Sequence, residues 1–304
     1  MTFPDLKKYT FSGHDSFQCR LLWLKKGYDY LLNEHSFAAD DAPVRLGVGN
    51  NMVRSIRYWL RAFGLTDEDE KLTKLAHLLF DSQTGFDPFL EDQATLWLLH
   101  RQLLITRHAS TYWLIFNELR RRRPEFAVDD FVQYVTKVKA EQEKFTANAD
   151  TLANDFKVFT KLYIQGGRQA KDREEGFAGI LTELDLLKPL ERKADDGKSL
   201  GTVYSIPLTD RADLPAELIL YCLLDTPGLS LSINLETLET EPDMPCAVFA
   251  MNRAGLLQKI DQLTDRYPNL LIYSDQSGVR ELQFKEKPTD KFQILRDYYV
   301  PALV

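Results

Sequence analysis

Apolar side chains recur at helical spacing through residues 50–63, and basic side chains occupy the opposite face of the same segment. The stripe predicted to be buried consists of Met52, Val53, Ile56, Leu60 and Phe63. The opposite face carries Arg54, Arg57, Tyr58 and Arg61. Glycines at positions 47 and 49 permit a tight turn before this helix, and Gly64 stands where a left-handed C-terminal cap is expected. We therefore interpret residues 46–65 as the turn and second helix of a winged helix-turn-helix, capped by Asn50 or Asn51.

The segment before this motif predicts a strand followed by a helix. The strand covers residues 9–11 and leads through the polar residues 12–16 into the helix. Gly27 is expected to end that helix. Its predicted core face consists of Phe17, Leu21, Leu24 and Tyr28.

Further helices are predicted after the helix-turn-helix. The acidic residues 66–70 suit the start of a helix capped by Thr66, because carboxylates are favoured at the positive end of the helix dipole. Residues 91–104 and 109–123 are rich in Leu, Trp and Phe and predict two more helices, the second stopped by Pro124.

The C-terminal half repeats the pattern of a helix followed by a hairpin. Residues 180–187 end like a helix, and a polar loop over residues 193–201 leads to a strand over residues 202–206. A helix over residues 253–265 precedes two strands, 270–273 and 279–284. Both patterns are typical of a winged-helix unit.

We therefore predict an α+β, mainly helical fold made of winged helix-turn-helix units with small β-hairpin wings. Residues 1–125 would form a DNA-binding winged-helix domain, residues 126–175 a helical connector, and residues 176–304 one or more winged-helix-like domains. The connector includes long polar helices over residues 129–164 that could also support a homodimer.

The charge distribution places any DNA-binding surface in the N-terminal part. The net charge is −7, but residues 1–123 hold 17 Lys and Arg against 15 Asp and Glu, whereas the rest holds 21 against 30. The three cysteines form no CxxC pair, and no signal peptide or membrane-spanning apolar run is present. A cytoplasmic protein without a membrane partner is expected.

Polar groups concentrate at the predicted strand-to-helix junction. His14 could act as a general acid or base near neutral pH, with Asp15 beside it, and Arg20 could hold a phosphate oxygen. The alternative is structural, with Ser12, Asp15 or Ser16 capping the helix and His14 making a local hydrogen bond.

Several groups could bind the phosphates of DNA. Residues 47–51 lead into a helix N-terminus, where free N–H groups favour an anion. Arginines on the face of that helix would contact the groove or the backbone. Lys25, Lys26 and the run of arginines at 120–123 could contact phosphate or could be solvated. Residues 47–51 lack the lysine and hydroxyl of a P-loop, so no nucleotide cofactor is expected.

The sequence gives no clear metal site. Asp275 followed by Glu281 and Gln283 faintly resembles a nuclease core, but Gln stands where such a core has Lys, and a plain hairpin explains the segment as well. The histidines show no ligand spacing. Mg²⁺ or Mn²⁺ could assist phosphodiester cleavage, with ligands unknown.

Four segments carry a family resemblance: YTFSGHDSFQCRLLWLKKGYDYL, VRLGVGNNMVRSIRYWLRAFGL, GFDPFLEDQATLWLLHRQLL and YPNLLIYSDQSGVREL. They resemble a bacterial family described only as a domain of unknown function, DUF4007, and the resemblance spans most of the chain. Motif positions of the family are present at His14-Asp15, Arg20, Arg45 and residues 47–52. Position 50 is Asn where Lys is expected in many relatives.

The resemblance implies a role in DNA phosphorothioation, the replacement of a non-bridging backbone oxygen by sulfur, and hence in phage defence. It implies site-specific nicking of one DNA strand, with a cysteine desulfurase, an ATPase and a sulfur-insertion enzyme as partners. In this interpretation His14 is the acid or base, and Arg20 and Arg45 hold phosphate. The alternatives are a non-catalytic DNA-binding adaptor or regulator, and a scaffold whose winged helices bind only protein.

Overall fold

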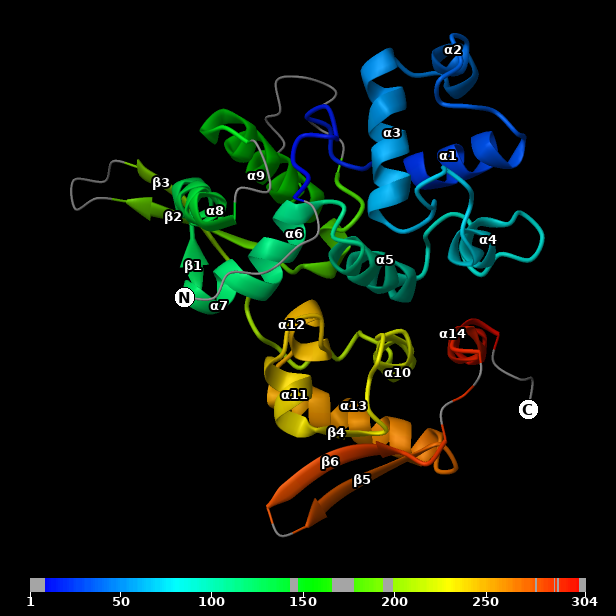
Figure 1. The fold of residues 1–304 in the computed structure, drawn as a ribbon, viewed down its shortest axis with the longest axis vertical. Helices are drawn as coiled ribbons and strands as arrows, with labels where there is room; N and C mark the ends of the chain where they lie inside the picture. Colours follow the sequence, from blue (N-terminus) through cyan, green and yellow to red (C-terminus); the bar gives the residue numbers. More distant parts are fainter. Residues whose placement is uncertain are drawn as a thin grey trace. The chain divides into compact units, whose positions relative to one another are not determined.

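The computed structural model describes residues 9–142, 147–165, 178–193, 199–276, 278–286, 288 and 290–300. Over these residues the fold is α+β, about half helical, with two three-stranded antiparallel sheets (Figure 1). The chain forms two compact units, residues 1–207 and 208–304. No helix in the described ranges is both long and apolar enough to cross a membrane.

The first unit begins with three helices, α1 (Trp23–Leu32), α2 (Ala42–Leu46) and α3 (Asn50–Ala62). Gly47 ends α2 with a left-handed backbone (φ +61°), and Gly49 precedes α3 in an extended conformation. The turn between α2 and α3 therefore uses both glycines as the sequence predicts. Val53, Ile56, Leu60 and Phe63 are buried as predicted, while Met52 is half-buried.

Two predictions for the first helices are wrong. The helix before the turn begins at Trp23 rather than near Phe17, and Gly27 lies inside it instead of ending it. Gly27 is there because α1 packs closely on α3. A Cβ at this position would lie 2.7 Å from Leu60 Cδ1 and 2.8 Å from Ile56 Cγ2.

The acidic segment after α3 forms a tight hairpin and does not start a helix. Thr66 and Leu72 form an antiparallel bridge, and the Asp67 carboxylate accepts hydrogen bonds from the N–H groups of Asp69 and Lys71. The next helix, α4 (Lys74–Phe80), is capped by Thr73, whose hydroxyl oxygen accepts from the Ala76 N–H. Thr66 is therefore not the cap. We call residues 66–72 the acidic hairpin.

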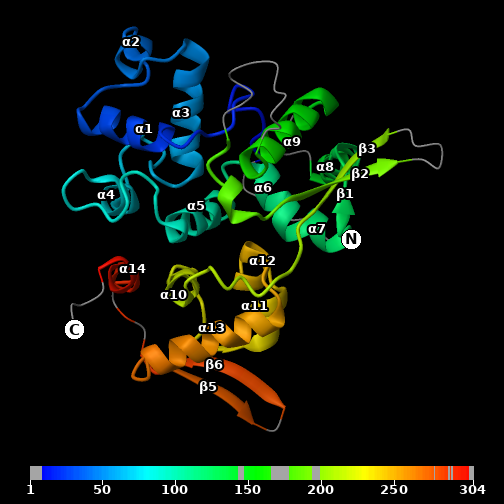
Figure 2. The same cartoon turned by 180° about the vertical axis from the view of Figure 1, so that it is seen from behind.

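The rest of the first unit is a helical layer and one sheet. Its helices are α5 (Gln93–Ile105), α6 (Ser110–Leu114), a π-helical turn (Ile115–Leu119), α7 (Arg120–Arg122), α8 (Val128–Gln142) and α9 (Ala149–Tyr163). A 3₁₀ turn (Thr182–Leu184) follows. The strands are β1 (Glu125–Phe126), β2 (Lys188–Lys193) and β3 (Ser199–Ser205). Phe156 of α9 packs on Tyr204 of β3, and both views show α8 and α9 beside this sheet (Figure 1 and Figure 2). Most of the predicted loop at 193–201 lies outside the described residues.

The second unit contains the predicted helix and hairpin at its C-terminal end. Its helices are α10 (Ala216–Leu224), α11 (Leu235–Thr240), α12 (Pro245–Phe249), α13 (Arg253–Arg266) and α14 (Phe292–Tyr299). Its strands are β4 (Ser232–Asn234), β5 (Leu271–Gln276) and β6 (Val279–Phe284). Within this unit α13 packs against β5 (Figure 1).

Both sheets have the same topology. In each, a short strand precedes a set of helices, a hairpin follows them, and the first strand pairs with the last, giving the orders β1-β3-β2 and β4-β6-β5. The hairpins are antiparallel, with Leu190 opposite Val203 in the first and Tyr273 opposite Leu282 in the second. Each unit thus contains a sheet with the same strand order and connections.

We expect Gly27→Ala to destabilise the protein by about 1–3 kcal/mol, because Ile56 and Leu60 are fully buried and have no room to move. Urea unfolding followed by tryptophan fluorescence measures this change. Alanine has the higher intrinsic helix propensity. An unchanged or increased stability would therefore contradict the close contact between α1 and α3.

Candidate nucleic-acid interface

The exposed face of α3 carries the three arginines predicted to contact DNA. Their side chains are 60%, 54% and 40% exposed for Arg54, Arg57 and Arg61. Tyr58, which the sequence placed on the same face, is buried instead. Its ring packs against His14 and His108, and the absence of a Cβ at Gly13 leaves room for it. The accessible face of α3 is therefore made by the arginines without the tyrosine.

Each of these arginines forms an ion pair with a carboxylate from outside α3. Arg54 Nε donates to Asp15 Oδ2 at 2.6 Å. The acidic hairpin supplies the other two partners, since Arg57 pairs with Glu70 and Arg61 with Glu68. The positive charge of the α3 face is thus largely compensated, and phosphate must compete with these carboxylates for the arginines.

The two asparagines at the start of α3 do not cap it. Gly49 is the N-cap residue and offers no side-chain cap, so the prediction that Asn50 or Asn51 caps the helix is wrong. Asn51 Oδ1 instead accepts a hydrogen bond from Arg54 at 2.7 Å. Both asparagines are exposed. The first N–H groups of α3 therefore remain available beside them, which is the arrangement that favours an anion.

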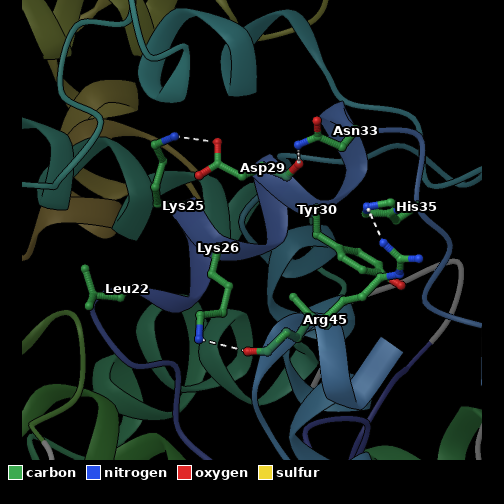
Figure 3. Close-up of a pocket in the computed structure, with 9 residues that line it drawn as sticks. Leu22, Lys25, Lys26, Asp29, Tyr30, Asn33, His35 and Arg45 are labelled. Atoms are coloured by element: carbon green, nitrogen blue, oxygen red, sulfur yellow. Dashed lines mark hydrogen bonds and ion pairs between the residues drawn. The ribbon is translucent and has the colours of Figure 1, made fainter. Parts of the chain in front are cut away.

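A cavity of about 510 Å³ lies between α1, α2 and the segment that joins them (Figure 3). It collects three of the predicted phosphate-binding side chains from two helices, together with a histidine that the sequence analysis did not select. The basic residues are Lys25, Lys26, His35 and Arg45, and the other lining residues include Leu22, Asp29, Tyr30 and Asn33. We call this cavity the α1–α2 pocket.

Partners inside the fold hold the pocket cations in place. Lys25 Nζ pairs with Asp29 at 2.5 Å and also donates to the Ser82 hydroxyl at 3.1 Å. Lys26 Nζ donates to the carbonyl of Leu46 at the end of α2, at 2.9 Å. These contacts use part of the donor capacity of each ammonium group, which has three N–H bonds.

Arg45 closes the other end of the pocket. Its Nε donates to Asp41 Oδ2 at 2.5 Å, and this contact holds the pKa of Asp41 below its usual range. One terminal nitrogen lies 3.5 Å from His35 Nε2 (Figure 3). The Tyr30 ring is buried beside His35, with centroids 5.0 Å apart, and burial raises the pKa of its hydroxyl.

His14 is buried in a hydrogen-bonded network. Ser16 N–H donates to its Nδ1 (3.2 Å), so Nε2 carries the proton that His14 donates to Asp155 Oδ1 (3.0 Å). Asp155 also accepts from Ser12 N–H at 2.7 Å and from the Thr111 hydroxyl at 3.0 Å. Both ring nitrogens of His14 are therefore engaged, and its side chain is only 2% exposed. This geometry favours a structural role for His14. The other part of that alternative is wrong, because α1 begins at Trp23 without a side-chain cap, and Ser12, Asp15 and Ser16 do not cap it.

The other two residues of the junction lie apart from His14. Asp15 points to Arg54 rather than into the buried network. Arg20 precedes α1, and its guanidinium carbon lies 5.1 Å from the centre of the Trp23 ring. The structure thus connects Asp15 with the α3 face and leaves the catalytic assignment of His14 and Asp15 as a prediction.

The residues described by the structure contain no cluster of three His, Cys, Asp or Glu side chains that could hold a metal ion. The weak nuclease-like pattern in the second unit fails for a geometric reason. Asp275 lies opposite Arg280 and pairs with it, whereas Glu281 lies opposite Ser274. Neighbouring positions of a strand point to opposite faces, so the two carboxylates diverge.

The sequence indicated the basic residues of the site but not the acidic residues that pair with them. Asp155 lies in a polar helix that gave no functional signal, and the carboxylates of Glu68 and Glu70 were assigned to a helix start. His35 stands between two predicted helices without a motif around it. Each of these residues acts through a contact with another helix or loop. The spacing of residues within one segment does not reveal such a contact.

Comparison with known proteins places the chain in a family. The model of the family described as "Protein of unknown function (DUF4007)" matches residues 11–299. The chain is similar to the magnesium ion-bound SspB crystal structure, with 30% identity and a TM-score of 0.82. It is also similar to a second SspB crystal structure, with 29% identity and a TM-score of 0.79. Each similarity covers 95% of this chain and 88% of the other. A comparison with curated proteins finds no match. The chain belongs to the DUF4007 family.

Proposed function

We propose that this protein binds DNA through its N-terminal helices and nicks one strand as part of DNA phosphorothioation. The observation that carries the proposal is the similarity to SspB structures over 95% of the chain. The resemblance described above links this family to strand nicking beside a sulfur-insertion enzyme, an ATPase and a cysteine desulfurase. The predicted cytoplasmic location agrees with such partners.

The DNA-binding part of the proposal is supported by the arrangement around α3. We interpret α2, the glycine turn and α3 as a helix-turn-helix, with the acidic hairpin in the position of a short wing. The same interpretation applies to the two sheets, whose hairpins β2–β3 and β5–β6 follow helices as wings do. Arginines on α3, the N–H groups of its first turn and the α1–α2 pocket offer phosphate contacts within the first unit.

The α3 arginines and the α1–α2 pocket would then have different roles in DNA binding. The α3 arginines are exposed and would meet the groove or the backbone, whereas Lys26 and Arg45 line a cavity and would hold a phosphate at a fixed point. Backbone contacts of this kind position DNA without reading its sequence, and they weaken as salt rises.

The second candidate function is a non-catalytic adaptor that brings DNA to the modification enzymes. Two observations favour it, namely the burial of His14 with both nitrogens engaged and the lack of a metal-binding cluster among the described residues. One relative is described as magnesium ion-bound, which supports a test with Mg²⁺ for the nicking proposal.

Incubation of the pure protein with supercoiled plasmid separates these two functions. We expect open circles in the presence of Mg²⁺ or Mn²⁺, because one cut in one strand releases the supercoil. An EDTA reaction is the control for the metal. Gel shifts without open circles under either metal would favour the adaptor and contradict the nicking proposal.

A second prediction concerns the ion pairs of α3. Arg54→Ala with Arg57→Ala should weaken DNA binding about tenfold or more at low salt, since two phosphate contacts are lost. Glu68→Gln with Glu70→Gln should instead strengthen it by roughly 3- to 10-fold, because the arginines lose competing partners.

Asp69→Asn is the matched control for the hairpin variant, since it removes a charge from the same hairpin but pairs with none of the three arginines. We expect its effect on affinity to stay within about twofold. Fluorescence anisotropy with a labelled duplex at two salt concentrations measures all three. Unchanged affinity in the arginine variant would exclude α3 as the DNA-contacting helix.

A third prediction separates the two roles of His14. We expect His14→Ala to lower the melting temperature, because Asp155 loses a buried hydrogen-bond donor, and to retain DNA binding and nicking at temperatures below melting. Thr111→Val removes another donor to the same carboxylate and serves as the comparison. Loss of nicking in His14→Ala, with unchanged melting temperature and unchanged DNA binding, would instead support the catalytic role.

A further inference from the structure

We propose that the α1–α2 pocket is a discrete phosphate-binding site, separate from the arginine face of α3. The proposal rests on the proposed DNA-binding function and deepens it by naming the group that this pocket takes. Three cations and one histidine line the pocket, against the carboxylate of Asp29 in the lining and that of Asp41 beside Arg45. Such an excess of N–H donors in one cavity fits an oxyanion with several acceptor oxygens.

The pocket is organised before any ligand arrives. Lys26 is fixed by the Leu46 carbonyl, and Arg45 by Asp41 and His35, so their remaining donors are held with little loss of side-chain entropy on binding. Lys25 is only 12% exposed, and its charge is therefore weakly screened by water. A volume of about 510 Å³ is ample for a phosphate and part of the attached sugar.

A phosphate bound in the pocket would connect two helices of the fold. Lys26 belongs to α1 and Arg45 to α2, so an oxyanion held by both connects the two helices (Figure 3). Leu22 stands 58% exposed at the pocket and offers an apolar surface to the remainder of a nucleotide. Phosphate binding at this site should therefore need both Lys26 and Arg45. An anion attracted only by the net charge of the surface would need neither residue in particular.

The pocket can be tested with inorganic phosphate as the probe, using the full chain. At about ten times the dissociation constant, phosphate should raise the melting temperature by roughly 3–5 °C relative to chloride of equal ionic strength. The ring proton signals of His35 should shift in the NMR spectrum as phosphate is added, and a His35→Gln spectrum assigns them. The signals of the buried His14 and His100 should stay in place.

Arg45→Met is the main variant, because the Arg45 side chain is half exposed and we expect its loss to leave the fold intact. It should weaken phosphate binding about tenfold, and Lys26→Met should do the same. Because Lys26 also bonds to the Leu46 carbonyl, the melting temperature of Lys26→Met in chloride is measured as its control. Arg192→Met removes a similarly exposed arginine on β2, which pairs with Glu125 of β1, and should bind phosphate like the original protein. Equal weakening in Arg45→Met and Arg192→Met, or an absence of any His35 shift, would overturn the proposal.

Oligonucleotides then distinguish the two sources of the phosphate. A short strand with a 5′-phosphate should bind several-fold more tightly than its 5′-hydroxyl form if the pocket takes a terminal phosphate, and equally if it takes a backbone phosphate. Either result supports the pocket when Arg45→Met weakens binding. Failure of all DNA binding with a retained phosphate-induced His35 shift would reject the proposed function and leave the pocket established.

Discussion

The buried carboxylate of Asp155 is the interaction on which the arrangement of the first unit depends. It accepts three hydrogen bonds, from the Ser12 N–H, His14 Nε2 and the Thr111 hydroxyl, and so connects the N-terminal segment, α6 and α9. The side chain is 3% exposed, and a carboxylate without these donors would be strongly unfavourable there. The junction at residues 12–16 is therefore fixed by a residue 141 positions further along the chain.

That junction in turn sets the position of α3. Ser55 donates to the carbonyl of His14 at 2.7 Å, and Trp59 Nε1 donates to the carbonyl of Phe17 at 3.0 Å. These contacts lie on the inner face of α3, one helical turn apart. The inner face is held by main-chain acceptors of the N-terminal segment, which leaves the outer face free to carry arginines. The orientation of the candidate DNA-binding helix thus follows from the burial of Asp155 and His14.

The local elements could be predicted from the sequence, but the contacts that make the site could not. The glycine turn, α3, α13 and the hairpin β5–β6 follow from periodicity and turn residues, which are properties of neighbouring positions. Gly27 was misinterpreted because a glycine that permits close helix packing looks the same in sequence as one that ends a helix. Charge patterns identified the arginines of α3 and gave no sign of the carboxylates that neutralise them.

Those carboxylates limit how strongly the α3 face can attract DNA in a chain whose net charge is −7. An arginine already paired with Glu68 or Glu70 must give up that carboxylate to bind a phosphate. Because the two ion pairs are similar in energy, the α3 face alone would bind DNA only weakly. In the α1–α2 pocket Lys25 and Arg45 are also paired, with Asp29 and Asp41, but Lys26 donates to the neutral carbonyl of Leu46. A phosphate seated there would meet one ammonium group that no carboxylate of the described residues neutralises, and there the exchange is more favourable. A strand anchored in the pocket would hold further phosphates beside α3 at a high local concentration. The α3 arginines could then exchange their carboxylate partners for these phosphates. Binding would accordingly depend on occupation of the pocket first, which restricts the protein to DNA that fits both sites.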